Sequence, residues 1–368
     1  MVGVGTITAN GISALFWLYM ASLLGSEDYG EVNYFISIAI IATTIALVGA
    51  APTITVYTAK GQKVAPILFV LTSLSGILIS VIIFFIFDSI GTSLLILGGI
   101  IFSVITSELL GKGFYKNYGK ILVLQKVLMV ILTIGFYYIW DLEGVLLGIA
   151  LSYFPFIYLA YKGLVSGKIE LGILKSKKFF MINSFSLELS RIFGGNVDKL
   201  IIAPLFGFML LGNYQLGIQF FLMMSILPSI VYQYSVRQDS KGITNYGLKK
   251  ITIILSVILS VISFIISPYL IPSLFPKFLD AIQVIQIVSF ALIPKTINLM
   301  YSSYLIGKEQ TKIILIGAGI YLITQISLIV ILGEIFGING IASSLIIALS
   351  IESIFLHFAK RHIEKKNE

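Results

Sequence analysis

Apolar runs of about 20 residues fill almost the whole chain, and this pattern constrains the fold more than any other feature. A run of this length is what an α-helix needs to cross the hydrocarbon core of a bilayer. No polar stretch between the runs is long enough to form a soluble domain. The sequence therefore predicts an all-α polytopic membrane protein of the cell membrane. We expect twelve spans, near residues 2–24, 32–58, 64–87, 91–111, 118–140, 144–162, 179–206, 211–235, 249–273, 281–306, 312–333 and 338–358.

Charge and cysteine content narrow the classes of function. The net charge is +8, but the basic residues are spread over several short loops, which indicates membrane topology and not nucleic-acid binding. The chain has no cysteine, so there is no disulfide framework and no thiolate metal site. His357 and His362 lie at or beyond the last span, where solvated or interfacial positions are expected. We therefore expect no cofactor and no metal.

The loops alternate in charge along the chain. Twenty Lys and Arg residues fall in one set of loops, whereas Lys277 is the one basic residue in the other set, which holds most of the acidic loop residues. By the positive-inside rule, the basic loops and both termini are cytoplasmic. Twelve is the number of spans that places every loop of the basic set on the cytoplasmic side and every loop of the other set on the outer side. The first run has no basic region before it and is too long for a signal-peptide core, so we interpret it as a retained span.

An internal repeat divides the chain into halves. The pattern Ser-x-Leu-x-Gly-Lys-x3-Lys occurs at residues 107–116 and again at 303–312, an offset of 196 residues. A second pattern, Ala-x-Leu-x-Gly-x4-Gly, occurs at 21–30 and again at 203–212. Because an even number of spans separates the copies, the two halves point the same way and are related by a pseudo-two-fold axis along the membrane normal.

The repeat predicts two lobes of six helices. A third echo, between the aromatic-x-aliphatic-x-Gly segments that end at Gly144 and Gly340, has the same offset of 196 residues. Transporters built from such repeats bind their substrate between the halves. We predict an N-terminal lobe at 1–162, a basic cytoplasmic linker at 163–178, and a C-terminal lobe with a basic tail at 179–368.

The seventh span is the most polar of the twelve. At about 100° per residue, Glu188, Arg191, Asp198 and Lys199 fall within one arc of roughly 100°, together with Ser184 and Gly195. A charge at the bilayer centre costs at least about 2.5 to 3.5 kcal/mol, so such residues face the interior of the bundle or an aqueous cavity and indicate a transport pathway. The alternative is structural pairing, of Glu188 with Arg191 and of Asp198 with a neighbour.

Polar residues in four other spans fit the same interpretation. Asn10 belongs to a polar stripe in the first span, and Lys126 lies in the cytoplasmic half of the fifth. Lys295 and Asn298 share a face of the tenth span, where the adjacent Pro294 is expected to bend the helix. Glu352 lies late in the twelfth span. The alternative for the uncharged members is ordinary hydrogen bonding between helices.

Three segments of the chain resemble a known family. They are Ala21-Ser22-Leu23-Leu24-Gly25-x3-Tyr29-Gly30-x3-Tyr34, Gly195-Asn196-Val197-Asp198-Lys199-Leu200, and Phe336-Gly337-Ile338-Asn339-Gly340-Ile341-Ala342. Their order and spacing resemble the polysaccharide-transporter family of Wzx-type oligosaccharide flippases, over nearly the whole chain. That family belongs to the multidrug/oligosaccharidyl-lipid/polysaccharide exporter superfamily. The resemblance implies a MATE-like fold and a flippase that moves polyprenyl-linked oligosaccharides to the outer leaflet by alternating access.

The resemblance also suggests roles for the polar residues. Basic residues of the seventh helix are implicated in the family, which points to Arg191 and Lys199. The diphosphate of the lipid-linked substrate is anionic and suits a guanidinium fork or an ammonium. We expect substrate binding by Arg191, Lys199, Lys295, Asn10, Lys126 and Asn298. We expect coupling to H⁺ or Na⁺ by Glu188, Asp198 and Glu352. Trp17 and Tyr214 could stack on sugar rings, and other glycan-assembly membrane proteins are expected partners.

Other classes of function fit the sequence less well. An enzyme would need a large outward loop or a convergent acid–base set, but the outward loops are short and the chain has no P-loop. A major-facilitator transporter would carry an acidic and basic motif after its second span, which is absent from residues 59–63. The serious alternative is a cation-coupled multidrug antiporter of the MATE type, in which the three acidic residues exchange protons or Na⁺ for a cationic substrate.

Overall fold

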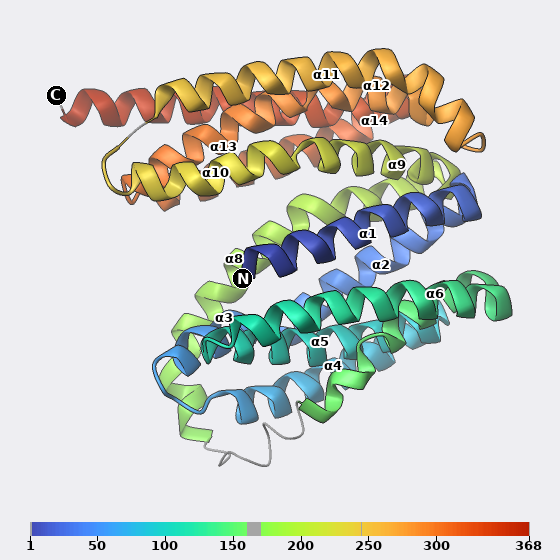
Figure 1. Ribbon diagram of the computed structural model, residues 1–368, viewed down its shortest axis with the longest axis vertical. Helices are drawn as coiled ribbons and strands as arrows, with labels where there is room; N and C mark the ends of the chain where they lie inside the picture. Colours follow the sequence, from blue (N-terminus) through green and yellow to red (C-terminus); the bar gives the residue numbers. More distant parts are fainter. Residues whose placement is uncertain (1, 160–170, 244, 368) are drawn as a thin grey trace. The chain divides into compact units, whose positions relative to one another are not determined.

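The computed structural model describes the backbone of residues 2–159, 171–243 and 245–367, and not the side chains of 2–4, 171–176, 190–191 and 364–367. Within these ranges the chain is helical, with short connections (Figure 1). The helices are α1 (Val2–Leu24), α2 (Ser26–Leu47), α3 (Ala50–Ala59), α4 (Ala65–Phe87), α5 (Ile90–Gly111), α6 (Tyr115–Leu151), η1 (Phe154–Phe156), α8 (Leu171–Phe206), α9 (Phe208–Met224), α10 (Ile226–Asp239), α11 (Tyr246–Leu274), α12 (Ala281–Phe290), α13 (Leu292–Gly307) and α14 (Thr311–Asn367).

The helices confirm an all-α polytopic membrane protein. Among the described residues, 8 helices are long and apolar enough to cross a membrane, or 9 if the bent pair α9 and α10 forms one span. This count does not confirm twelve spans, so that number stays a prediction. The count does not include α8, because the undescribed side chains of residues 190 and 191 divide this helix into shorter described stretches.

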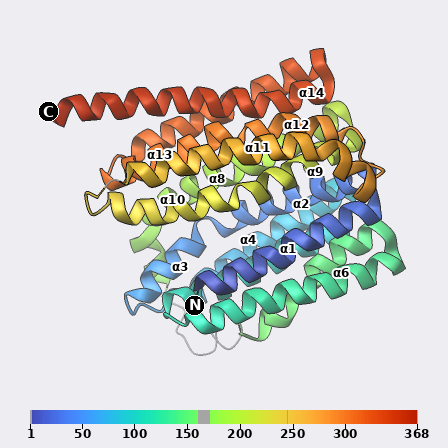
Figure 2. The ribbon, with the colours of Figure 1, turned by 45° about the horizontal axis from the view of Figure 1, so that its top comes forward.

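Two of the apolar helices, α6 and α14, are hairpins with two arms each. Gly148 lies against the backbone of Thr133, although a continuous helix would separate these residues by about 22 Å. In α14, a Cβ on Gly317 would lie 3.3 Å from the side chain of Leu356, far closer than a straight helix allows. Figure 2 shows α14 turning back on itself. Each of these helices therefore turns back on itself.

The turns of both hairpins lie at equivalent places in the repeat. The backbone reverses at Asp141 in α6 and at Gly337 in α14, with φ of 47° and 58°. These two positions are 196 residues apart, which is the offset found in the sequence. Gly144 and Gly340 follow at that offset, and each lies against the carbonyl eight residues earlier, at Phe136 and at Leu332, where a Cβ would not fit. The structure thus confirms the repeat in these two hairpins.

The chain divides into two compact units, and three short crossings connect them. Unit 1 comprises residues 1–16 and 32–196, and unit 2 comprises 17–31 and 197–368. The division differs from the predicted lobes because the α1–α2 turn belongs with unit 2 and the first part of α8 with unit 1. Residues 171–178, expected in the linker, are already helical in α8.

A pair of glycines explains why the α1–α2 turn belongs with unit 2. Gly30 on α2 lies against the backbone of α9 at Phe208 and Gly212, and Gly212 lies in turn against Ser26 and Gly30. These glycines are the last residues of the second repeat pattern. A side chain at either position would meet backbone atoms, so only glycine permits this close approach.

Two further helix breaks lie inside predicted spans. The predicted tenth span breaks at Ala291, between α12 and α13, three residues before Pro294. Proline cannot donate to the preceding turn and its ring presses on it, so the helix is interrupted near the position where a bend was expected. The predicted second span begins at Ser26, earlier than expected, and breaks at Val48 and Gly49, which both have positive φ.

Candidate functional site: a polar network in unit 2

The ionic face of α8 is divided between the two units. Glu188 is half-buried in unit 1. Arg191 lies on the same helix, but its side chain is outside the described residues, so the predicted pair of Glu188 with Arg191 is untested. Asp198 and Lys199 belong to unit 2, where their surroundings are described in full.

Asp198 accepts hydrogen bonds inside unit 2 from two neighbouring residues. The Lys199 Nζ lies 3.4 Å from its Oδ1, and the side chains of both residues are at most 10% exposed. The Lys199 amide donates to the same oxygen at 3.0 Å, and the Tyr214 hydroxyl donates to Oδ2 at 3.1 Å. Hydrogen bonding of this kind offsets the cost of burying a carboxylate. Asp198 thus has a neighbouring partner, and its role in transport stays a prediction.

The prediction that Tyr214 stacks on a sugar ring is wrong in this structure. Its side chain is fully buried, because α9 turns it toward Asp198 and the interior of unit 2. Trp17 packs its ring edge-on against Tyr29, with ring centroids 6.1 Å apart. Both aromatic residues thus contribute to the packing of unit 2.

Helix α14 extends the network beyond Asp198. Tyr214 and Tyr321 both hydrogen bond to the side chain of Gln325, which is buried. The Tyr321 hydroxyl also interacts electrostatically with both Asp198 and Glu352. Tyr321 therefore lies within electrostatic range of both carboxylates, and no hydrogen bond among the described residues joins it to either of them.

Glu352 is held in place by the neighbouring helix α13. Asn298 donates to the Glu352 carboxylate at 2.8 Å and to the Leu349 carbonyl at 3.1 Å. The Asn298 carbonyl oxygen accepts from Ser353. Because Asn298 is buried and its amide is fully engaged, it positions Glu352 here and is not turned toward a ligand.

Lys295 adds a cation to this end of the network. Its ammonium interacts electrostatically with Glu352, but no carboxylate of the described residues lies within 4 Å of it. Its side chain is half-buried, one turn of α13 before Asn298. Lys295 is therefore placed to attract an anion without first breaking an ion pair.

The structure thus brings together five of the nine predicted site residues and leaves four in unit 1. Asp198, Lys199, Lys295, Asn298 and Glu352 share the network in unit 2. The residues of unit 1 are Asn10, Lys126, Glu188 and Arg191. Asn10 is exposed on α1, and Lys126 lies 3.9 Å from the sulfur of Met129 on its own helix.

The sequence interpretation missed two members of the network and one separate ion pair. Tyr321 and Gln325 are polar residues one turn apart in an apolar helix, and this spacing was the available signal. The ion pair joins Asp239 at the end of α10 to Lys249 on α11, at 2.6 Å, and both side chains are buried. Ser303 on α13 donates to the same carboxylate oxygen at 2.7 Å. The signal here was an acidic residue within a basic loop.

Comparison with known proteins decides the fold family. No family model and no curated protein matches the sequence. Solved structures do match: the inward closed conformation of the lipid II flippase MurJ has a TM-score of 0.77 at 15% identity, covering 98% of this chain and 87% of the other. An inward-facing multidrug resistance MATE transporter has a TM-score of 0.74 at 15% identity, covering 97% of this chain and 94% of the other. The chain has a MATE-like fold.

The similarity to solved MATE transporters extends to a second conformation. An outward-facing conformation of a multidrug resistance MATE transporter is also similar, with a TM-score of 0.64 at 16% identity over 100% of this chain and 96% of the other. At this identity the likeness concerns the fold, so the chemistry has to be argued from the residues themselves. Two buried or half-buried carboxylates, one beside Lys199 and the other near Lys295, can take up a proton, a monovalent cation or an anionic group.

Proposed function

We propose that this protein is a membrane transporter, and not an enzyme, that flips a polyprenyl-diphosphate-linked oligosaccharide from the cytoplasmic to the outer leaflet by alternating access. The MATE-like fold supports transport, since both a drug exporter and a lipid flippase are similar to it. The resemblance of the sequence to oligosaccharide flippases supports the choice of substrate. We further propose twelve crossings with both termini cytoplasmic, counting two arms each for α6 and α14 and one crossing for α8.

The proposed role of the polar network in transport rests on one comparison inside the chain, between the network and its counterpart in unit 1. At the offset of 196 residues, Asn298 and Glu352 correspond to Phe102 and Phe156. The contact is kept, since the two rings have centroids 5.5 Å apart within an apolar cluster. The fold is therefore built in unit 1 without a carboxylate at this place, so stability alone does not require one in unit 2. A buried carboxylate without a structural need indicates function.

The residues divide into two proposed roles. Lys295, Lys199 and Arg191 bind the substrate diphosphate, and Lys295 is the best supported because no carboxylate of the described residues contacts it. Glu352 and Asp198 take up H⁺ or Na⁺ and so couple transport to an ion gradient. We also propose roles with less support, which are substrate binding by Asn10 and Lys126 and ion coupling by Glu188. Asn298 contributes by positioning Glu352.

The alternative is a cation-coupled multidrug antiporter, and the two carboxylates of the network favour it. In that case Asp198 and Glu352 would bind a cationic drug in exchange for protons or Na⁺, and the lysines would be structural. The two functions differ in the sign of the charge that the network must attract. Lys295 therefore separates them.

The experiment uses the full chain in proteoliposomes with two substrates. A lipid-linked oligosaccharide is scored by its exposure to an impermeant glycan-modifying enzyme, and a cationic dye is scored by efflux. We expect flipping by the native protein, loss of flipping in Lys295→Gln, and partial activity in Lys295→Arg. Dye efflux without flipping would establish the antiporter instead. Normal flipping by a well-expressed Lys295→Gln protein would refute the role of this lysine.

Arg191 and the coupling residues need separate variants. If Arg191 is only the partner of Glu188, the double change Arg191→Gln, Glu188→Gln should restore both folding and flipping. If Arg191 binds diphosphate, the double variant folds but does not flip, and Arg191→Lys keeps part of the activity because the fork is lost. Coupling is tested by Asp198→Asn and Glu352→Gln under imposed H⁺ and Na⁺ gradients, where normal transport by both would refute it.

A further inference from the structure

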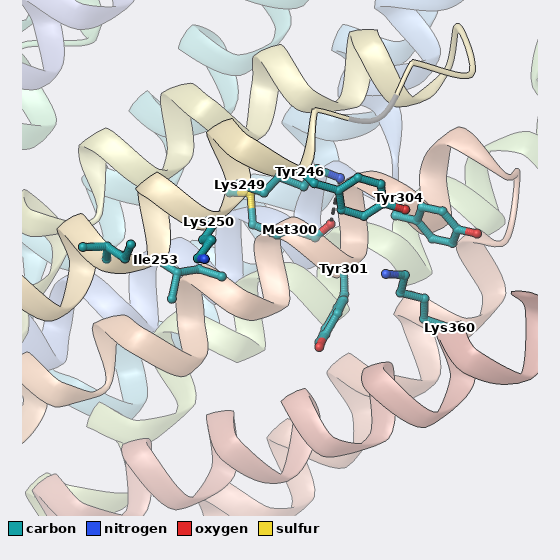
Figure 3. A pocket seen from close by; sticks show the side chains of 9 residues that line it. Tyr246, Lys249, Lys250, Ile253, Met300, Tyr301, Tyr304 and Lys360 are labelled. Atoms are coloured by element: carbon teal, nitrogen blue, oxygen red, sulfur yellow. Dashed lines mark hydrogen bonds between the residues drawn. The ribbon is translucent and has the colours of Figure 1, made fainter.

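A pocket of about 430 Å³ opens at one end of unit 2, one turn of α13 beyond Asn298 (Figure 3). It lies between the first turns of α11, the last turns of α13 and the late part of α14. This end of unit 2 carries the basic α10–α11 connection and the basic tail, so it faces the leaflet on the side of the basic loops. Tyr301 is held by a hydrogen bond at 2.8 Å between its hydroxyl and His357 Nδ1.

Lysines and tyrosines make up most of the lining of the pocket. Lys360 places its ammonium over three aromatic rings, at 5.6 Å from the centroid of Tyr246, 5.8 Å from Tyr301 and 5.1 Å from Tyr304. These contacts hold the long side chain at the pocket, as Figure 3 shows for Tyr301 and Tyr304. The flexible cation is thereby ordered before any ligand arrives, which lowers the entropy cost of binding.

The lining of the pocket is positively charged. Lys249, Lys250 and Lys360 line the pocket, and no acidic residue is among the residues that line it. Lys249 is neutralised by Asp239 at 2.6 Å and also donates to the Met300 carbonyl at 3.5 Å. Lys250 is exposed and makes no ion pair with the described residues. The lining as a whole is therefore cationic and attracts an anion.

The remaining residues that line the pocket are apolar. Ile253 and Ile254 follow Lys250 by about one turn of α11, and Met300 lies opposite on α13. An anionic solute that is polar on all sides would place polar groups against these apolar side chains. Burying the side chains would then contribute no hydrophobic stabilisation to binding. A ligand with an anionic head and a hydrocarbon chain fits both kinds of lining residue, because the chain extends along α11 into the bilayer.

We propose that this pocket binds an anionic phospholipid of the leaflet on the basic side. Its phosphate lies between Lys250 and Lys360, within reach of the tyrosine hydroxyls, and an acyl chain packs on Ile253 and Ile254. Clusters of basic residues beside membrane-spanning helices attract anionic lipids in this way, and tyrosines favour the same depth. The proposal concerns a bound lipid that is not transported, so it is independent of the proposed flippase activity.

The test is native mass spectrometry of the full chain, titrated with phosphatidylglycerol and with phosphatidylcholine. We expect preferential retention of phosphatidylglycerol, and about a fivefold loss of its affinity for each lysine removed in Lys250→Gln and Lys360→Gln. The matched control is Lys241→Gln with Lys308→Gln, because both residues are on the same side of unit 2 but do not line the pocket. This control should keep the native affinity.

Three results would overturn the proposal. The first is an equal loss of phosphatidylglycerol affinity in the control and pocket variants, and the second is native affinity in the Lys250→Gln, Lys360→Gln protein. The third is displacement of the lipid by glycerol phosphate at the same concentration, which would show a site for a free phosphate. We compare the unfolding of native and variant protein in phosphatidylcholine alone. This comparison distinguishes a loss of lipid binding from a loss of folding. A variant that unfolds is replaced by Ile254→Asn, which leaves the lysines in place and is expected to weaken binding through the acyl chain.

Discussion

Replacement of Asp239 by Asn should destabilise the protein far more than loss of an ordinary surface ion pair. Asp239 and Lys249 are 2% and 11% exposed and 2.6 Å apart. At an effective dielectric near 20, their attraction is on the order of 6 kcal/mol, but desolvation of the two ions offsets most of it. In Asp239→Asn the Lys249 ammonium stays buried without its partner, and such a loss costs about 3 to 5 kcal/mol.

The chain supplies a matched control in unit 1. Glu108 and Lys112 form an ion pair at 2.5 Å, one turn apart on α5, with side chains 17% and 43% exposed. Water screens this pair, and pairs of this type contribute about 0.3 to 0.5 kcal/mol. Glu108→Gln makes the same chemical change as Asp239→Asn, so only burial distinguishes the two variants.

The assay is the apparent midpoint of thermal unfolding in detergent, together with the half-life at a fixed temperature. We expect a shift of several degrees for Asp239→Asn and almost none for Glu108→Gln. The double variant Asp239→Leu, Lys249→Met removes both buried charges and should recover most of the loss, since apolar replacement of a buried pair is often neutral or stabilising. Equal shifts for both single variants, or a double variant less stable than Asp239→Asn, would refute this reasoning.

Three further predictions follow from the fold and the network. Gly212→Ala should lower the free energy of unfolding by several kcal/mol, because the added Cβ would meet backbone atoms of α2. The control Gly135→Ala should be neutral, because its Cβ would meet nothing within 4 Å. Equal expression and stability of the two variants would contradict the close approach at Gly212. Single cysteines at exposed Ser240 and Ser273, near opposite ends of α11, should differ in labelling of intact cells by an impermeant thiol reagent, with only position 273 labelled; labelling of 240 alone would reverse the proposed orientation. Tyr214→Phe removes a donor to a buried carboxylate and should lower stability by about 1.5 to 3 kcal/mol; an unchanged unfolding midpoint would show that the bond contributes nothing.

The sequence predicts the helices well because their apolar length is a property of each segment alone. Most predicted spans agree with the helices within a few residues. The breaks were harder to predict. Pro294 signals its bend directly, since its ring cannot be accommodated in a straight helix. The break at Val48 carries no such residue before Gly49, so tertiary packing determines where it falls.

Charges were placed less well than helices because burial depends on residues far apart in the sequence. Lys249 has the sequence context of a loop lysine, yet it is buried because Asp239, ten residues earlier, and Ser303 meet it. Lys277 is the exception to the charge rule, and its side chain lies over Gly25 in the α1–α2 turn. Local sequence shows neither contact, since each joins different helices.

The repeat provides a comparison that a single sequence otherwise lacks. Gly111 and Gly307 are equivalent, and each lies against a helix of its own unit, at Thr58 in unit 1 and at Asp239 in unit 2. As at Glu352, the contact is kept while unit 2 alone carries the carboxylate. The packing that the two units share explains why both contacts are kept. It does not explain the carboxylates of Glu352 and Asp239, because unit 1 has none at the equivalent contacts. The shared scaffold therefore does not account for these two carboxylates of unit 2, because buried charges cost free energy that the scaffold does not require.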